Sequence, residues 1–463
     1  FRREEIMLNQ STLLIIPDST NLFQKRVHLW LLAHKTICRY RFAKVECRIQ
    51  ENEWIKGNEI IIDENGMYAI EAQTELGEMI RAKFSVCFLN SKPEFEGGTG
   101  SADSPFLVKT AAQLNAIRCD LGASYRLISD VDLSGPEWGI GWYPIGDFEL
   151  SLDKMGVIID HKAGFWGCLD GAGYEIKNLT AVYPNKEHIG LMGYLEGTVK
   201  NLHLLDANLS GKQYVGGIAG TFCGCIEGVS VSGKLSGDDL IGGIVGEVIE
   251  NMSDNALVTI SKCAFKGCIS GKVSDNIKTN AIGGIAAGCS GSQIQISDCT
   301  VNAKLQFSGG IFGISGCTPT TIANCLARGK IMTACSSDTS IVYGIGSAYR
   351  WTGKEIPEWG VSGCVSAWDE IAFADGDIAD LEYIFDHIGI PPMEVESVSS
   401  IPNILLDAKN IKISTMQTPV CYHGAYSFER EKNIISENDL EKMGWDFTST
   451  WKMGDDGWPE LQF

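Results

Sequence analysis

The stretch VGGIAGTFCGCIEGVSVSGKLSGDDLIGGIVG, residues 215–246, decides the fold because it begins and ends on the same glycine-rich phrase. Related phrases recur through the middle of the chain: IGLMGY from Ile189, VGGIAG from Val215, IGGIVG from Ile241, IGGIAA from Ile282, SGGIFG from Ser308 and a weaker VYGIGS from Val342. Their starts are separated by 26, 26, 41, 26 and 34 residues. Repetition at such spacings is typical of architectures in which one short supersecondary unit stacks on copies of itself.

A second run, in which apolar and polar residues alternate, follows these phrases, as in CIEGVSVSGKLSG from Cys225 and ISDCTVNAKLQ from Ile296. Such alternation indicates half-buried strands, and the glycines between them permit tight bends. A β-propeller blade needs four strands in about 40–45 residues, so a solenoid with shorter coils fits the spacing better. We therefore predict an all-β chain with a parallel β-helix from about Trp166 to Cys364. Its inward column is expected to contain Ile218, Ile244, Ile285 and Ile311.

Cysteine recurs at one position of the repeat, at Cys263, Cys299, Cys325 and Cys364. Equivalent positions of successive coils lie above one another, so we expect these thiols to form an interior column of small apolar groups. The alternative is a zinc site, for which the best pairs are Cys223 with Cys225 and Cys263 with Cys268. Neither pair has the CxxC spacing and no paired histidines accompany them, so we expect no metal and no cofactor.

The composition is that of a large soluble protein with a strong acidic bias: 463 residues, 44% hydrophobic, with a net charge of −20. Nucleic acids and anionic membrane surfaces require basic patches, so we expect neither as a partner. No apolar run is long enough to span a bilayer and no signal-peptide pattern opens the chain, so a signal or anchor is expected outside it. The 16 cysteines are too regularly placed for a small disulfide framework, and a reducing or anaerobic environment would keep them as thiols.

Residues 1–92 differ from the repeats, because they consist of short alternating strands separated by turn signals. About seven such strands in under a hundred residues is the size of a β-sandwich. The stretch 51–86, ENEWIKGNEIIIDENGMYAIEAQTELGEMIRAKFSV, resembles the immunoglobulin-like modules of bacterial surface proteins. The residues that carry this resemblance are Trp54, Ile60, Glu64, Asn65, Gly66, Tyr68, Ala72 and Gly77. Trp54 is interpreted as a core or strand-edge aromatic, with ligand stacking as the alternative.

The remaining boundaries follow from composition. Residues 93–105 read as a flexible Gly/Ser/Pro linker, and Thr110 is placed to cap a short helix that holds Leu114 and Ile117. Residues 106–370 read as the β-helix with its leading cap. Residues 371–463 break the period and read as a C-terminal cap over the exposed coil edge, with a short helix near Ser436.

The order of phrases from Gly98 to the first VGGIAG resembles bacterial surface proteins that carry GLUG repeats. The matching residues are Gly98, Thr99, Gly100, Pro105, Leu114, Tyr125, Leu127, Asp130, Asp132, Leu133, Trp142, Pro144, Ile145, Gly146, Phe165, Gly167, Asp170, Gly171, Gly173, Tyr174, Ile176, Asn178, Leu179, Gly190, Gly193, Gly197, Val199, Asn201 and Leu202. The tail WDFTSTWKMGDDGWPELQF, from Trp445, resembles the way such arrays end. The resemblance covers most of residues 97–370 and implies a right-handed parallel β-helix on a secreted or surface-attached bacterial protein. Related repeats also occur beside immunoglobulin A-cleaving metalloprotease domains, but this chain has no HExxH motif, so that activity is not implied.

Paired carboxylates are the enzyme-like feature to test, because glycoside-cleaving enzymes use two acids on one face. The candidates are Asp130 with Asp132, Asp238 with Asp239, and Asp375, Asp377 and Asp380. Asp130 and Asp132 alternate along one strand and therefore point to the same side. They also belong to the phrase that leads into the repeats, which favours a cap or turn role.

Three functions are compatible with the sequence. The first, which the repeats and the missing catalytic motifs favour, is a non-catalytic adhesin, extracellular or on the cell surface, that binds host or cell-surface glycans or proteins. The second is a β-helix glycosidase or lyase, and the third is a structural stalk. For a binding module, the candidate contact residues are aromatic residues outside the repeats, namely Trp138, Trp142, Trp351 and Trp359.

Overall fold

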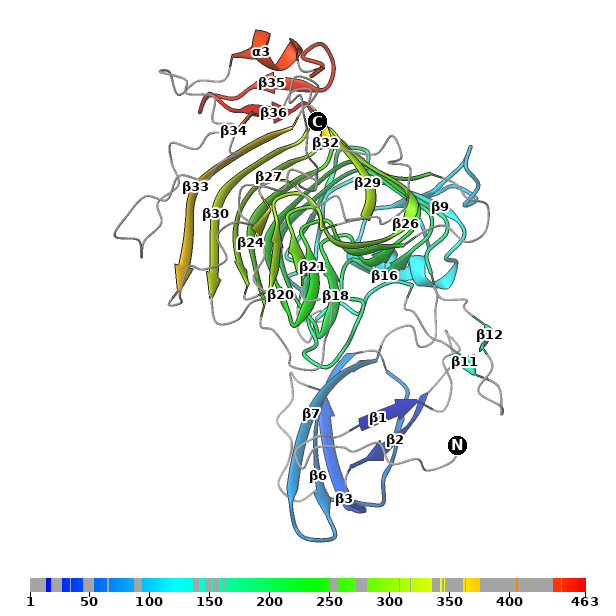
Figure 1. Ribbon diagram of the computed structural model, residues 1–463. Coiled ribbons are helices and arrows are strands. Elements are labelled where there is room, and N and C mark those ends of the chain that lie inside the picture. Colours follow the sequence, from blue (N-terminus) through cyan, green and yellow to red (C-terminus); the bar gives the residue numbers. More distant parts are fainter. Residues whose placement is uncertain are drawn as a thin grey trace. The chain divides into compact units, whose positions relative to one another are not determined.

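The computed structural model describes residues 14–17, 27–33, 35–44, 54–64, 66–86, 94–135, 141–146, 151–152, 158–160, 164–249, 257–271, 281–307, 309–316, 318–334, 342–343, 345, 361–362, 364–374, 405–406, 436–442 and 444–463. Strands dominate these residues (Figure 1). The chain divides into two compact units, one formed by Phe1–Glu94 with Ser134–Gly141 and the other by Phe95–Leu133 with Trp142–Phe463.

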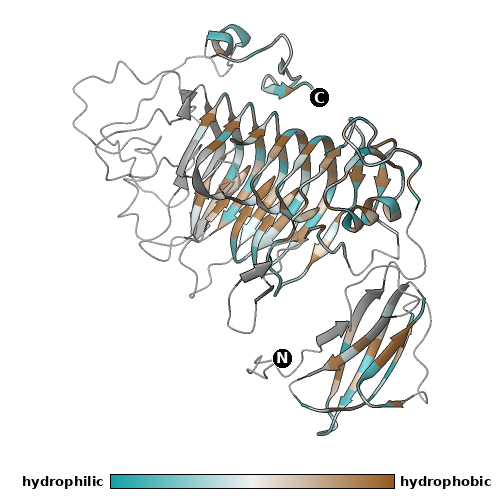
Figure 2. Cartoon of the chain, turned by 90° about the vertical axis from the view of Figure 1, so that its right-hand side faces the viewer, coloured by the Kyte–Doolittle hydropathy of each residue, from teal (hydrophilic) through white to brown (hydrophobic). Residues whose placement is uncertain are grey.

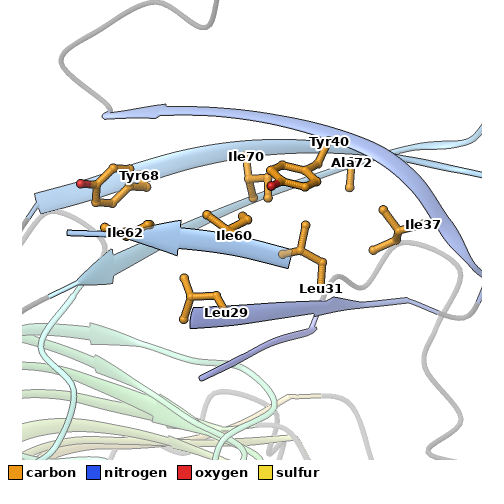
Figure 3. Close-up of a cluster of buried hydrophobic side chains, with 9 residues drawn as sticks. All are labelled: Leu29, Leu31, Ile37, Tyr40, Ile60, Ile62, Tyr68, Ile70 and Ala72. Atoms are coloured by element: carbon orange, nitrogen blue, oxygen red, sulfur yellow. The ribbon is translucent and has the colours of Figure 1, made fainter. Parts of the chain in front are cut away.

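The first unit contains two antiparallel sheets that share one core. The smaller sheet consists of β1 (Leu14–Pro17), β2 (Val27–Leu32) and β5 (Glu59–Ile62), and the larger one of β4 (Ile55–Lys56), β3 (Ile37–Lys44), β6 (Gly66–Thr74) and β7 (Met79–Val86). Figure 3 shows the buried side chains between them, which are Leu29, Leu31, Ile37, Tyr40, Ile60, Ile62, Tyr68, Ile70 and Ala72. An immunoglobulin-like topology stays a prediction.

Trp54 does not belong to this core. The guanidinium groups of Arg39 and Arg41 lie 4.5 and 4.7 Å from the centroid of its ring. Glu71 accepts hydrogen bonds from Arg41 and from Arg81, which lies on the next strand. The indole is therefore half-buried under arginine side chains on the outer face of the larger sheet, a stacking arrangement that cations and aromatic faces favour.

The second unit begins with a tightly bonded turn rather than a free linker. The amide of Leu107 donates to the carbonyl of Gly97, and that of Glu96 donates to the carbonyl of Leu107. The rings of Phe95 and Phe106 stack at 4.7 Å. Gly98, at φ 86°, permits the turn, since a Cβ there would lie 1.9 Å from a backbone oxygen. The expectation of a flexible linker over 93–105 is therefore corrected for its described residues, because hydrogen bonds hold them to the first strand of the stack.

The predicted helix follows at α1 (Ala111–Asn115), continued by the 3₁₀ turn η1 (Ala116–Cys119). The hydroxyl of Thr110 accepts from the amide of Gln113, whose side chain accepts in return from the amide of Thr110. This capping box and the complete burial of Leu114 and Ile117 confirm the predicted cap and apolar face.

The strands of the second unit wind into a stack of parallel coils. The first of them are β8 (Phe106–Val108), β9 (Ser124–Leu127), β10 (Val131–Asp132), β13 (Cys168–Asp170), β14 (Glu175–Lys177) and β15 (Thr180–Val182), with a separate hairpin β11 (Ser151–Leu152) and β12 (Ile158–Asp160). Further coils are built from β16 (Met192–Leu195), β17 (Thr198–Ser210), β18 (Gln213–Gly216), β19 (Ala219–Phe222), β20 (Cys225–Gly237), β21 (Asp239–Gly242), β22 (Val245–Ile249), β23 (Val258–Ser261), β24 (Ala264–Gly271), β25 (Ala281–Gly283) and β26 (Ala286–Ser297). The last are β27 (Thr300–Phe307), β28 (Gly310–Phe312), β29 (Thr318–Ala323), β30 (Leu326–Ala334), β31 (Val342–Tyr343), β32 (Val361–Ser362), β33 (Val365–Ala374) and β34 (Leu405–Leu406).

Each strand pairs in parallel with its equivalent in the next coil. One face consists of β17, β20, β24, β27, β30 and β33, another of β16, β19, β22 and β26, and a third of β18, β21, β25, β28 and β31. Seen from the side, the coils form successive rungs (Figure 2). This arrangement is a parallel β-helix, as the repeats predicted. Its right-handed winding stays a prediction.

The inward isoleucine column differs from the predicted one at a single member. The amide of Ile218 donates to the carbonyl of Ile244, the amide of Ile244 to Ile285, and the amide of Ile285 to Ile314. Ile311 instead pairs with Ile282 in the neighbouring column. The prediction that equated the GGI of SGGIFG with the GGI of the earlier phrases was therefore wrong by three residues, and Ile314 takes the place predicted for Ile311. In this coil Phe312, and not a glycine, is the register partner of Gly283.

One corner of each coil explains the spacing of the cysteines. Successive coils place Asn201, Gly228, Lys262, Asp298 and Asn324 there, all with φ between 51° and 64°. Asn, Asp and Gly tolerate this left-handed conformation better than other residues. The residue that follows turns inward, and after the last three of these corners it is Cys263, Cys299 and Cys325; these three and Cys364 are fully buried. The predicted thiol column is confirmed, and its members are free cysteines.

Slow thiol chemistry is the expected consequence. Burial raises the pKa of the Cys299 and Cys325 thiols well above its usual range, so their reactive thiolate forms are scarce. We expect these cysteines to react slowly with a maleimide in the native protein and rapidly in denaturant, with the exposed Cys38 as the fast internal control. Peptide mapping after timed labelling measures the difference. Native labelling of Cys325 as fast as Cys38 would contradict the column.

The C-terminal residues pack on the side of the coils. Helix α3 (Glu437–Lys442) is followed by the hairpin β35 (Trp451–Met453) and β36 (Pro459–Leu461). Their buried side chains Leu440, Trp445, Trp451 and Leu461 form a cluster with Leu326 of β30, and Ala264 of β24 borders it. The described part of the tail thus packs against β24 and β30, on one face of the stack. A cap over the exposed coil edge stays a prediction.

Candidate functional site

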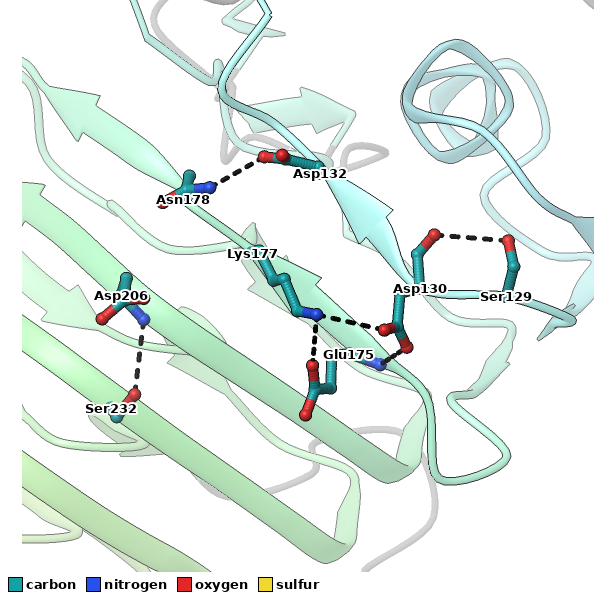
Figure 4. Close-up of polar contacts among 8 residues, drawn as sticks. All are labelled: Ser129, Asp130, Asp132, Glu175, Lys177, Asn178, Asp206 and Ser232. Carbon is teal, nitrogen blue, oxygen red and sulfur yellow. Dashed lines mark hydrogen bonds and ion pairs between the residues drawn. The ribbon is translucent and has the colours of Figure 1, made fainter.

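The carboxylate of Asp130 lies in a small charged cluster at the start of the coil stack (Figure 4). It accepts hydrogen bonds from the amide of Glu175 and from the Nζ of Lys177, both at 3.1 Å. The same ammonium group lies 2.6 Å from the carboxylate of Glu175. These contacts hold the residue before β10 against β14, the strand with which β10 pairs.

Electrostatics favour the charged forms of this cluster. The backbone hydrogen bond from Glu175 and the bond from Lys177 lower the pKa of Asp130, and the two carboxylates raise the pKa of Lys177. Both side chains are also exposed to a third or more of their area, so solvent screens the attraction. A general acid for glycoside cleavage needs a raised carboxyl pKa, and Asp130 shows the reverse.

Asp132 is bonded in a different direction. Its carboxylate accepts a 2.8 Å hydrogen bond from the side-chain amide of Asn178, the residue that follows β14 (Figure 4). Asn178 has φ 61°, so this bond helps to fix a left-handed turn. Asp130 and Asp132 are therefore each tied to a separate group of the next coil. The arrangement matches the cap or turn role that the sequence favoured.

Of the four tryptophans proposed as contact residues, the structure describes Trp142. Its side chain is only 1% exposed, and its indole N–H donates to the carbonyl of Leu191 at 2.9 Å. Trp142 therefore belongs to the core of the coil stack and offers no surface to a partner, which corrects its place among the contact residues. Trp138, Trp351 and Trp359 lie outside the described residues, as do Asp375, Asp377 and Asp380.

A second group of polar side chains lies beside β19 and β22; the sequence offered its Asp239 as a candidate, paired with Asp238, but not its other members. Glu247 stands next to Thr221 in the strand ladder, and the hydroxyl of Thr221 lies 2.9 Å from the Nδ1 of His188. The imidazole of His188 stacks on the ring of Tyr214 at 4.7 Å. Nearby, the fully buried Asp239 accepts hydrogen bonds from the amides of Leu240 and Ala281, at 2.8 and 3.0 Å.

The signal for Glu247 was present in the repeat itself. The equivalent position holds Tyr194, Thr221 and Gly288 in the other coils, so an acid there is an exception. Burial, with repulsion from Asp239 as a smaller cause, raises the pKa of Glu247 to about 7. Among the described carboxyl groups, that of Glu247 has a pKa that suits a proton donor near neutrality.

The raised pKa predicts how stability depends on pH. The folded protein binds a proton on Glu247 that the unfolded chain releases above pH 4.5, its ordinary pKa. Stability from this group is therefore fully present below about pH 4.5 and is lost as pH rises through about 7. Glu247→Gln is expected to be more stable than the parent at pH 8, on the order of 2–3 kcal/mol, and equal to it at pH 4. Urea unfolding at both pH values measures this, with Glu227→Gln, at an exposed carboxylate of the same stack, as control. A Glu247→Gln variant that keeps the parent's full pH profile would refute the assignment.

Neither a metal site nor a membrane span emerges from the described residues. Within them, His, Cys, Asp and Glu do not gather in threes or more in a way that could hold a metal ion. None of the described helices has both the length and the apolar character required to cross a bilayer.

Two curated proteins share sequence with part of this chain, and no protein-family model matches it. Halomucin of Haloquadratum walsbyi is 36% identical over 156 residues, which cover 33% of this chain and 2% of halomucin. A putative Gly-rich membrane protein of Evansella cellulosilytica is 33% identical over 146 residues, which cover 30% of this chain and 15% of that protein. The chain thus spans a small fraction of the length of the curated relatives it matches.

Among solved structures, an IgA1 protease aligns with 84% of this chain and 27% of its own length, at 19% identity and a TM-score of 0.47. A pectate lyase from Pectobacterium carotovorum aligns with 87% of this chain and 99% of its own, at 9% identity and a TM-score of 0.13. Both scores are below the level at which a shared fold supports a functional argument.

Proposed function

We propose that this chain is a non-catalytic binding module of a secreted or cell-surface bacterial protein, an adhesin that contacts a host or cell-surface glycan or protein. The observation that carries the proposal is that the two candidate catalytic carboxylates, Asp130 and Asp132, are both engaged in contacts within the stack. Asp130 is ion-paired with Lys177, and Asp132 is bonded to Asn178, so both serve the packing of neighbouring coils. What the stack offers instead is a series of long, regular lateral faces, which suit extended ligands.

The wider setting supports an extracellular role. The sequence resembles proteins with GLUG repeats and an immunoglobulin-like module, and the proposal includes a right-handed winding of the coils. One relative is named a halomucin and another a putative membrane protein. A module of a much longer surface protein is consistent with the small share of those relatives that the chain matches.

One observation favours the enzyme alternative. Glu247 has a pKa near neutrality, and Asp239 and His188 belong to the same group of side chains. A glycosidase or lyase would need such a protonated carboxyl beside a second, ionised one. The carboxylate of Asp239 is buried and already accepts two backbone hydrogen bonds, which leaves it poorly placed to meet a polymer.

A binding screen tests the proposal. The whole chain is applied to arrays of neutral and acidic glycans and to immobilised mucin-type glycoproteins, and bound protein is quantified over a range of concentrations. Saturable binding to at least one of these is expected. An absence of binding to all of them would favour the structural stalk and overturn the adhesin.

A further inference from the structure

Lysines recur on the outward side of one face of the coil stack. Lys234 of β20, Lys266 of β24 and Lys304 of β27 stand on three adjacent strands, which lie side by side in Figure 1. Lys234 pairs in register with Cys268, and Cys268 pairs with Lys304. We call this surface the lysine face and define it by Lys234, Lys266 and Lys304.

The three ammonium groups are available to a ligand. All three side chains are exposed, whereas the residues that flank Lys234 and Lys304 inward, Leu235 and Leu305, are buried. Among the described residues, the ion pairs of neighbouring cations join Arg328 to Asp456 and Lys262 to Glu227, and none involves the lysine face. Lys330 continues the row on β30, where its partner in register is Glu370 of β33.

This face is locally basic in an acidic protein. The strand segments 230–236, 264–271, 300–307 and 326–332 contain five Lys or Arg and no Asp or Glu, although the chain has 58 acidic residues and a net charge of −20. The positions beside the lysines hold neutral hydrogen-bonding groups, such as Ser232, Asn302 and Gln306. The absence of acids from these four strand segments is not required by packing, because outward positions tolerate any polar residue.

The spacing of these charges identifies the kind of polymer that fits. Neighbouring parallel strands are about 4.8 Å apart, so Lys234 and Lys304 are separated by about 10 Å across the sheet. Duplex DNA carries one charge per about 1.7 Å of its axis, which is far denser than this row. An acidic polysaccharide, with one carboxylate or sulfate per sugar or per pair of sugars, has a lower charge density and many hydroxyl groups. Those hydroxyls match the Ser, Asn and Gln side chains between the lysines.

We propose that the lysine face binds an extended acidic polysaccharide that runs across the strands, with its anionic groups against Lys234, Lys266 and Lys304. This inference rests on the proposed binding function and names its ligand class. Contact with exposed ammonium groups is electrostatic and is weakened by salt. Because the rest of the chain is acidic, the polymer is attracted to the lysine face and repelled by the other surfaces.

The test compares two variants with equal charge. One replaces Lys234, Lys266 and Lys304 by Gln, and the control replaces Lys200, Lys212 and Lys262 by Gln, so both change the net charge from −20 to −23 (38 − 3 − 58). The probe is polygalacturonate, with its fully methyl-esterified form as the neutral counterpart. Binding is measured by titration at low and high salt. The lysine-face variant is expected to lose about tenfold or more of the parent's affinity at low salt, and the control variant to keep most of it.

Other results separate this inference from the proposed function. If the parent binds a neutral glycan or a glycoprotein but not polygalacturonate, the lysine face is wrong and the binding module stands. Equal loss of affinity in both variants would show a non-specific charge effect and overturn the lysine face. Stronger binding of duplex DNA than of polygalacturonate would also overturn the choice of ligand. Circular dichroism of both variants checks that the substitutions leave the fold intact.

Discussion

Replacing Ile244 by Asp is expected to unfold the coil stack. Ile244 is fully buried, and its backbone joins the coil before it, through Ile218, to the coil after it, through Ile285. A carboxylate at this place would lack any partner, which costs several kcal/mol, while a domain of this kind has a total stability of only about 5–15 kcal/mol. Because each coil contacts only its neighbours, loss of one coil exposes the apolar ends of two others.

The measurement for Ile244→Asp is thermal unfolding followed by circular dichroism, with limited proteolysis at room temperature. The matched control is Ile244→Val, which removes one methyl group and is expected to cost about 0.5–1.5 kcal/mol. A parent-like Tm for Ile244→Asp would show that the side chain does not point into the stack.

Replacing Trp451 by Ala is expected to release the C-terminal tail from the coils. Trp451 is fully buried, its ring lies 4.2 Å from that of Trp445, and its indole nitrogen lies 3.3 Å from a carboxylate oxygen of Asp298 at a coil corner. Removing a buried tryptophan costs about 3–5 kcal/mol. The other buried side chains of the cluster, Leu440, Trp445 and Leu461, lose the indole as a packing partner, and the ion pair between Arg328 and Asp456 at 2.7 Å lies at the periphery.

Limited proteolysis with mass spectrometry measures the release. In Trp451→Ala, cleavage within residues 436–463 is expected to become fast, while the coils resist. Asp456→Asn is the control, because an ion pair at the surface contributes at most about 1 kcal/mol. If Trp451→Ala protects the tail as well as the parent does, another contact holds it.

Much of the fold could be predicted from the glycine-rich phrases, because a fixed repeat forces equivalent residues into register. The cysteines illustrate why this works. Asp298 and Asn324 precede Cys299 and Cys325 in the sequence, and in the structure they occupy the left-handed corner that turns the cysteine inward. The sequence showed that Asp or Asn precedes these cysteines, and the backbone geometry of the corner explains why.

The errors have physical causes too. Ile311 was assigned to the wrong column because the prediction compared residue types, whereas backbone hydrogen bonds decide the register. In this coil Phe312 occupies the position that Gly283 occupies in the previous coil. Trp142 was proposed as a contact residue because an isolated tryptophan gives no sign of its burial, whereas in the fold its indole finds the carbonyl of Leu191.

The candidate sites were less predictable than the fold, because they depend on which side chains meet across coils. The pairing of Asp130 with Lys177 joins residues 47 positions apart, and no local pattern announces it. Glu247 gains its raised pKa from burial and from Asp239, which lies in a strand of another sheet.

The most direct test of the central claim, that this stack of coils binds without cleaving, is the size of polysaccharides recovered after long incubation with concentrated protein. Pectic and mucin-type polysaccharides are separated by size-exclusion chromatography and assayed for new reducing ends, with the parent chain compared with Asp130→Asn, Asp132→Asn and Glu247→Gln. The account predicts polymers of unchanged length in every sample. Shortening by the parent that any of these three substitutions abolishes would contradict it and assign the chain as an enzyme.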